Sequence, residues 1–266
     1  MIQGIVYDLG AAVSLLPLAL VNRRVTAGRD RMFWLATALA VAGPAMHALG
    51  QIFGPWHTGF AMAMWMAVAV SVLLFAGLAA VSRSAWRLAP LLAPYLIALG
   101  LLAAIWRTAV GPRLSAPIPL GWVELHIGVS VVTYGLLTLA AVAALGAFLQ
   151  ERALKRKQRT PLTMMLPAVA ESEGLSGRLL VASEVVLGVG ILSGMAVQYL
   201  ETARLLVLDH KSLLALLAFA LILALLASRR LWGLRGRAAA RGILVAYLLL
   251  TLAYPGVKFV TDVILA

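Results

Sequence analysis

The 266-residue chain contains no cysteine, which excludes disulfide bonds, thiolate-bound metals, CxxC redox pairs and covalent cofactor attachment through a CxxCH motif. Charged residues are also scarce, at 12% of the chain, whereas a soluble domain has about a quarter. Hydrophobic residues make up 63%, and the mean hydropathy is +0.98. Such a chain has too little polar surface to enclose a soluble core. The composition therefore predicts a polytopic membrane protein.

Eight apolar runs are long enough to cross a bilayer, which takes about 20 residues of helix. They cover residues 2–21, 32–53, 60–81, 88–106, 122–149, 179–198, 210–227 and 242–264. The first run precedes its nearest arginines, the reverse of the order in a cleaved signal peptide, so we expect it to be retained. No ten-residue units of alternating hydrophobicity suggest a barrel. We predict an all-α fold, a single integral-membrane domain over residues 1–266 with about eight transmembrane helices.

Basic residues are divided unequally between the two sets of connections. Seventeen of the 22 follow the first, third, fifth and seventh predicted helices, and only Arg107, Arg113 and Arg204 lie in the opposite connections. The positive-inside rule then places both termini outside, in the periplasm or its equivalent. We therefore interpret the net charge of +12 as a topology signal rather than as a sign of nucleic-acid binding. The expected location is a bacterial inner membrane, with lipids as partners.

The fifth predicted helix is longer than a membrane crossing requires. Residues 122–149 would span about 42 Å, against a hydrocarbon core of roughly 30 Å. The basic segment ERALKRKQR, residues 151–159, follows directly. We predict that it continues the helix into the cytoplasm and contacts anionic headgroups.

All four histidines lie on the predicted outer side, at positions 47, 57, 126 and 210. Imidazoles within membrane helices suggest function, because hydrocarbon offers them no water. The alternative for each is hydrogen bonding to headgroups and loop carbonyls. On the fifth helix, His126, Ser130 and Thr133 share one stripe at 100° per residue, and Gly128 and Gly135 lie on the opposite face. The glycine face is expected to pack closely against a neighbouring helix.

The later helices carry charged and small residues at membrane depth. Glu184 suggests either an ion pair with an inner arginine or a proton relay. Lys258 and Asp262 are spaced to pair with each other at i and i+4. Gly190 and Gly194 are spaced for close helix packing.

Three segments carry a family resemblance. They are LHIGVSVVTYGLLTLAAVAALGAFLQERALKRK at 125–157, LPAVAESEGLSGRLLVASEVVLGVGILSG at 166–194 and DHKSLLALLAFALILALLASRRLWGLRGRAAARGILVAYLLLTLAYPGVKF at 209–259. They resemble the cytochrome c assembly family that includes CcsA and HemX, and most closely its small branch represented by the inner membrane protein YpjD. The resemblance covers at least the carboxy-terminal half, and His47 fits the pattern of the same branch.

The resemblance implies a haem-handling inner-membrane protein that supports cytochrome c biogenesis from the periplasmic face. Its cofactor would be non-covalent, b-type haem, with His126 and His210 as axial ligands of the iron and His47 as the substitute ligand. For two histidines on one iron, the ring nitrogens must come within about 4 Å of each other. Arg113 and Arg204 are on the side where they could pair with the haem propionates.

One departure from the family bears on activity. The full assembly proteins carry a tryptophan-rich WWD segment in an outer loop, whereas the corresponding connection here, YLETARLLVLDHK, has no tryptophan. The second outer histidine expected after that segment is also missing. The resemblance therefore does not extend to haem-lyase activity, and we assign no catalytic residue.

Two other classes of function remain open from the sequence. One is a regulatory or interaction subunit without haem, for example one that stabilises a metal-ion transporter. The other is a small-molecule or metal transporter with the outer histidines at its entrance. Expected protein partners are accordingly cytochrome c assembly components or another membrane protein.

Overall fold

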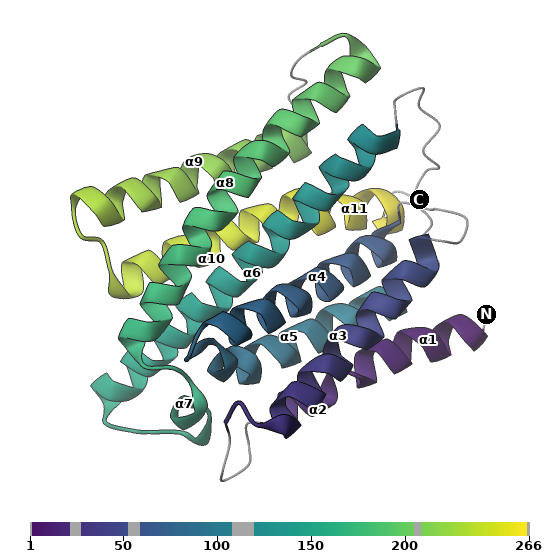
Figure 1. The fold of residues 1–266 in the computed structure, drawn as a ribbon. Coiled ribbons are helices and arrows are strands. Elements are labelled where there is room, and N and C mark those ends of the chain that lie inside the picture. Colours follow the sequence, from purple (N-terminus) through teal and green to yellow (C-terminus); the bar gives the residue numbers. More distant parts are fainter. Residues whose placement is uncertain (1, 22–27, 53–58, 108–119, 205–208, 265–266) are drawn as a thin grey trace.

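The computed structural model describes residues 2–21, 28–52, 59–107, 120–204 and 209–264. Within these ranges the chain is a bundle of helices without a strand (Figure 1). Eight helical stretches in the described part are long and apolar enough to cross a membrane, which confirms the predicted fold class. The amino and carboxy ends lie on the right-hand side in Figure 1, where α6 (Leu120–Arg156) begins and α8 (Val169–Thr202) ends.

The amino-terminal half contains four crossings. Their helices are α1 (Ile2–Val13), α2 (Leu16–Val21), α3 (Arg31–Ile52), α4 (Phe60–Val81), the 3-10 turn η1 (Ala85–Leu88) and α5 (Ala89–Ile105). The first predicted helix is broken into α1 and α2. Pro17, in the first turn of α2, lacks the N–H that a continuous helix would need. At the break, Ser14 Oγ donates to the carbonyl of Ala11 over 2.8 Å. Gly43 of α3 provides room, since a Cβ there would lie 2.0 Å from Ser14 Oγ.

The carboxy-terminal half consists of longer helices and an irregular final crossing. After α6 come α7 (Pro161–Met165), α8, α9 (His210–Leu231) and α10 (Gly236–Thr251). The last crossing continues through the π-helical segment η2 (Leu252–Gly256), the turn α11 (Val257–Phe259) and the π-helical segment η3 (Val260–Ile264). Pro255 lies inside η2, and proline and π-helical geometry are recognised causes of irregularity in helices. The predicted crossing at 242–264 is therefore confirmed as a span, within the longer helical stretch Gly236–Ile264, and its second half is irregular.

Helix α6 has 37 residues, a length of about 55 Å. It passes Gln150 without a break and ends at Arg156. The predicted continuation of the helix into 151–159 is therefore confirmed as far as Arg156. Contact with lipid headgroups stays a prediction. Where the helix leaves the bundle, Gln150 Nε2 donates to the carbonyls of Thr163, Leu166 and Pro167, over 2.7, 3.2 and 3.2 Å.

Helices α6 and α8 pack in antiparallel fashion through small residues. A Cβ on Gly194 of α8 would lie 3.0 Å from His126 Cε1 of α6. At the other end of the helix pair, a Cβ on Gly146 of α6 would lie 3.7 Å from Ser172 Oγ of α8. The predicted packing role of the glycines in α8 is therefore confirmed. The opposite face of α6 fits the prediction in part. Gly135 approaches Leu74 of α4, but among the described residues no atom lies within 4 Å of a Cβ placed on Gly128.

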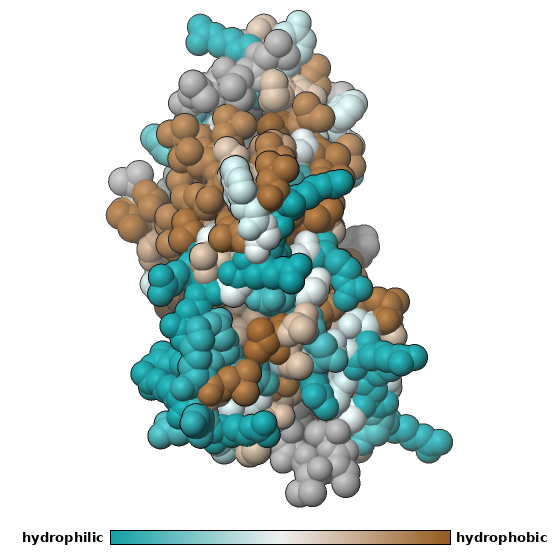
Figure 2. All heavy atoms as spheres, turned by 90° about the vertical axis from the view of Figure 1, so that its left-hand side faces the viewer, coloured by the Kyte–Doolittle hydropathy of each residue, from teal (hydrophilic) through white to brown (hydrophobic). Residues whose placement is uncertain are grey.

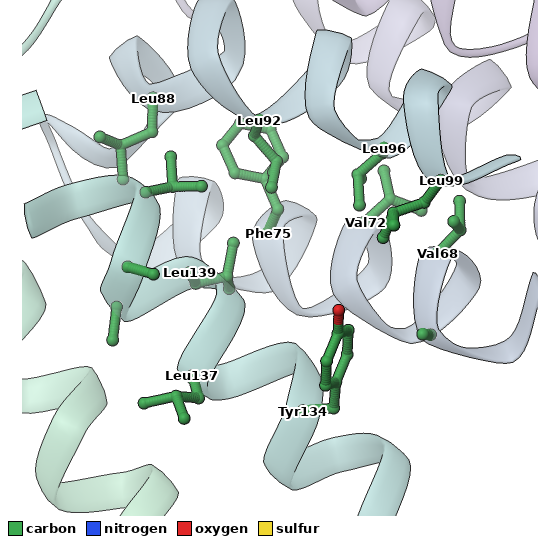
Figure 3. Packing of buried hydrophobic residues seen from close by; sticks show 14 of the residues in the cluster. Val68, Val72, Phe75, Leu88, Leu92, Leu96, Leu99, Tyr134, Leu137 and Leu139 are labelled. Carbon is green, nitrogen blue, oxygen red and sulfur yellow. The ribbon is translucent and has the colours of Figure 1, made fainter. Parts of the chain in front are cut away.

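The bundle core lies between α4, α5 and α6, where buried hydrophobic side chains pack together (Figure 3). Phe75 of α4, Leu92 and Leu96 of α5 and Leu139 of α6 are fully buried. The core also encloses a polar network in which the hydroxyls of Tyr95, Tyr134 and Tyr247 contact one another. Because lipid is as apolar as these side chains, close packing and buried hydrogen bonds supply the association energy of the helices.

The end of the bundle opposite the termini is strongly polar. Figure 2 views the left-hand side of Figure 1, where α7 and the connection between α9 and α10 lie, and hydrophilic side chains gather over its middle and lower part. Here Glu151 pairs with Lys155 and Arg237, and Glu173 accepts from the N–H of Gly236 over 2.8 Å. These contacts connect the ends of α6, α8 and α10.

Candidate functional site

A cavity of about 460 Å³ lies between α4, α6, α8, α9 and the final crossing. Cofactor and small-molecule sites typically measure 300–1,000 Å³ and combine an apolar lining with a few polar groups. The polar residues that line this cavity are His126, Ser130, Thr133, Gln198, Asp209, Lys211, Ser212, Tyr254 and Lys258. The stripe on α6 predicted from helical periodicity therefore lines one cavity.

His126 has a defined hydrogen-bond partner on the neighbouring helix. Its Nδ1 lies 2.9 Å from Ser193 Oγ of α8, and Ser193 Oγ in turn donates to the carbonyl of Gly190 over 2.9 Å. Which of the two groups donates in the His126–Ser193 contact depends on the tautomer of the imidazole.

The ring of His126 fits against the backbone of α8 because residue 194 is glycine. The 3.0 Å from a Cβ at Gly194 to His126 Cε1 is closer than side chains tolerate without displacement. One turn earlier, a Cβ at Gly190 would lie 3.4 Å from Val129 of α6. The two glycines thus set the distance between α6 and α8 beside the cavity.

Cationic and anionic groups meet at the start of α9. Lys211 and Lys258 both line the cavity, and Lys211 is close enough to interact electrostatically with Lys258 and with His126. Asp209 caps α9 by accepting from the backbone N–H of Ser212 over 2.7 Å. Partial burial acts to raise the pKa of Asp209, but this hydrogen bond and the nearby Lys211 outweigh it, so the pKa is lowered from its usual range.

Three methionines, Met62 and Met66 of α4 and Met195 of α8, also line the cavity. Methionine is adaptable and polarisable, and it suits a pocket that receives a large apolar ligand. These methionines were not predicted from the sequence. The i, i+4 spacing of Met62 and Met66 was the available signal. Met195 joins them in the cavity only because α6 packs against both α4 and α8.

The other predicted ligands lie at different places. His210 is the first residue of α9 and is exposed; its neighbours Asp209 and Lys211 line the cavity, whereas His210 does not. Arg204 is exposed in the connection after α8 and is not among the lining residues. Arg113 and His57 lie outside the described residues. The structure therefore brings His126 to the cavity together with lysines rather than with Arg204.

His47 belongs to a separate buried cluster. Its Nε2 lies 3.0 Å from Asp8 Oδ1 of α1 and 2.6 Å from Gln51 Nε2. Asp8 also accepts from Trp65 Nε1 of α4 over 2.9 Å and lies 3.8 Å from Arg107 Nε. A partner for Asp8 could not be predicted from the sequence, although Asp8 is the one charged side chain of the first apolar run. The cluster connects α1, α3 and α4 with Arg107, which lies just after α5, and it is not part of the cavity lining.

The charged residues of the later helices also have defined surroundings. Glu184 is buried, and within the described residues neither carboxylate oxygen has a hydrogen-bond partner. Neither predicted role for it is tested by this. Asp262 accepts from Thr261 Oγ1 over 2.9 Å, and Lys258 faces the cavity.

The chain belongs to the cytochrome c assembly protein family. The family described as "Cytochrome C assembly protein" matches residues 32–265, so the relationship extends well beyond the carboxy-terminal half. Membership supports a role in cytochrome c biogenesis for this multi-pass membrane protein. The chain is also 53% identical, over 270 residues and the full length of both proteins, to an Azospirillum brasilense protein described as "Uncharacterized 28.8 kDa protein in nifR3-like 5'region".

Proposed function

We propose that the protein binds non-covalent, b-type haem in the cavity at His126 and handles it on behalf of cytochrome c biogenesis, as a member of the YpjD branch of the family. The observation that carries this proposal is the imidazole of His126 on the wall of a 460 Å³ cavity, with its Nδ1 already engaged by Ser193. The volume, the imidazole and the apolar lining suit a large planar cofactor.

The donor set of the cavity fits haem. His126 Nε2 would hold the iron, while Lys211 and Lys258 would attract the propionates and Met62, Met66 and Met195 would exclude water from the ring. When bound, haem supplies an iron centre that can change its oxidation state. As the family resemblance implies, His210 would be the second residue to hold the iron; it is exposed at the start of α9, between Asp209 and Lys211 of the lining. His47 stays a substitute ligand, and Arg113 and Arg204 stay candidates for the propionates.

The cavity is proposed to face the periplasm across a bacterial inner membrane. The chain termini and the start of α6 lie at one end of the bundle, and hydrophilic side chains gather at the other (Figures 1 and 2). Basic connections are retained in the cytoplasm. Reporter fusions are expected to place the 157–160 connection inside and the carboxy terminus outside. An outward 157–160 connection would reject this orientation.

The test of haem binding is the absorption spectrum of protein purified from haem-replete membranes. The wild type is expected to show a Soret band, and His126→Ala is expected to abolish it. His57→Ala removes an imidazole from elsewhere in the chain and should leave the band intact. His210→Ala should shift the band, because it removes the second residue that would hold the iron. Wild-type protein without Soret absorbance would refute the proposal and leave a non-haem interaction subunit as the better interpretation.

A further inference from the structure

The hydroxyl of Ser193 is placed where it can select the form of the His126 imidazole. Neutral imidazole exists as two tautomers, with the proton on Nδ1 or on Nε2, and the hydrogen bond of one nitrogen determines which is present. Ser193 is 6% exposed, and it lies on α8 with its oxygen 2.9 Å from His126 Nδ1. Water therefore competes little for this contact.

The direction of that hydrogen bond follows from the backbone of α8. Ser193 Oγ donates its only proton to the Gly190 carbonyl, three residues earlier in the same helix, over 2.9 Å. A carbonyl oxygen only accepts. The hydroxyl oxygen consequently faces His126 with its lone pairs, and the imidazole must bring the proton.

From this geometry we infer that Ser193 is a positioning residue that holds His126 as the Nδ1–H tautomer and presents the Nε2 lone pair to the cavity. The inference rests on the proposed function and deepens it, because it assigns Nε2 as the nitrogen that binds the haem iron. Gly194 contributes as well: because it has no side chain, the ring of His126 can lie directly against α8. Ser193 itself touches no ligand in this scheme.

The chain offers a matched control on the same helix. Ser183 is also buried, and it donates to the Leu180 carbonyl three residues earlier over 2.9 Å. It shares with Ser193 the burial and the hydrogen bond to the carbonyl three residues earlier, and it lies ten residues from Ser193 on the same helix. Any effect of losing a buried hydroxyl from α8 as such should appear in Ser183→Ala as well as in Ser193→Ala.

The first measurement uses the metal-free protein in detergent, with nitrogen-15 label in the histidines. The two ring-nitrogen chemical shifts of His126, identified by their absence in His126→Ala, report the tautomer. Wild type, Ser183→Ala and Ser193→Thr are expected to show Nδ1–H, while Ser193→Ala should move toward Nε2–H. A wild type with Nε2–H, or a Ser193→Ala spectrum like that of the wild type, would overturn the inference.

The second measurement titrates hemin into the same purified proteins. Groups that orient a metal-binding histidine typically contribute 10–100-fold in affinity, so Ser193→Ala should weaken hemin binding by about that factor. Ser193→Thr and Ser183→Ala should remain close to the wild type, and Gly194→Ala should weaken binding by displacing the ring. If Ser193→Ala binds hemin like the wild type, the positioning role is overturned while the proposed function stands. If no variant binds hemin but the nitrogen shifts follow Ser193, the proposed function fails and the tautomer assignment stands.

Discussion

Replacing Asp8 tests whether the buried cluster around it holds α1, α3 and α4 together. The Asp8 side chain is 5% exposed. Its Oδ1 accepts a hydrogen bond from Trp65 Nε1 over 2.9 Å and lies 3.0 Å from His47 Nε2. Its third partner, Arg107, is 3.8 Å away and 23% exposed, so water and headgroups screen that pair and it should contribute little. Removal of one member of a buried ionic cluster costs about 3–5 kcal/mol, because its partners remain buried without compensation.

We therefore expect Asp8→Ala to lower the free energy of unfolding by about 3–5 kcal/mol. Asp8→Asn retains an acceptor for Trp65 but loses the charge, so its cost should be smaller, about 1–3 kcal/mol. Reversible unfolding in mixed detergent micelles, followed by tryptophan fluorescence, gives both values. A double-mutant cycle with Trp65→Phe should show a coupling of about 1 kcal/mol, which is typical of hydrogen bonds between membrane helices. If Asp8→Ala unfolds like the wild type, the cluster does not stabilise the bundle and the reasoning is wrong.

Three further substitutions test other contacts. Gly43→Ala should cost about 1–3 kcal/mol by overpacking against Ser14. In the same unfolding assay the double variant with Ser14→Ala should recover only part of the loss, because the Cβ of residue 14 would still lie 2.6 Å from the new Cβ. Tyr247→Phe removes a hydroxyl that contacts two other tyrosines. It should lower the midpoint of thermal unfolding by an amount equivalent to about 1–3 kcal/mol. An unchanged midpoint would refute a stabilising role for this network. Asp209→Ala should cost about 0.5–2 kcal/mol through loss of the N-cap. The pKa of Asp209 is lowered on folding. The stability that this cap contributes is therefore fully present above about pH 4 and is lost as the pH falls through the folded pKa. If the difference in unfolding free energy between Asp209→Ala and wild type stays constant down to about pH 2, the assignment is wrong.

Local periodicity was sufficient to predict those parts of the molecule that a single helix determines. The stripe of His126, Ser130 and Thr133 follows from the 100° rotation per residue, and all three line one cavity. The long α6 likewise follows from its unbroken apolar run and basic end. The interruption between α1 and α2 was missed because hydropathy is continuous across it, although Pro17 marked the place.

Contacts between separate helices could not be predicted from the sequence. The pairs Asp8 with His47 and His126 with Ser193 join residues 39 and 67 positions apart. Hydropathy shows that each helix is buried in lipid, but it does not show which faces meet. For the same reason His47 was grouped with the haem ligands on account of its side of the membrane, whereas packing places it with Asp8.

The bonds of Gln150 have a consequence at the far end of α6. Gln150 connects α6 to three carbonyls of the segment that leads into α8, and His126 lies 24 residues earlier, about 36 Å away along the helix. These bonds therefore hold α6 at a defined position along its axis relative to α8. If α6 slid along α8 by a single turn, His126 would move by about 5.4 Å and leave Ser193. The contact between His126 Nδ1 and Ser193 Oγ at one end of the bundle thus depends on the hydrogen bonds of Gln150 near the other end.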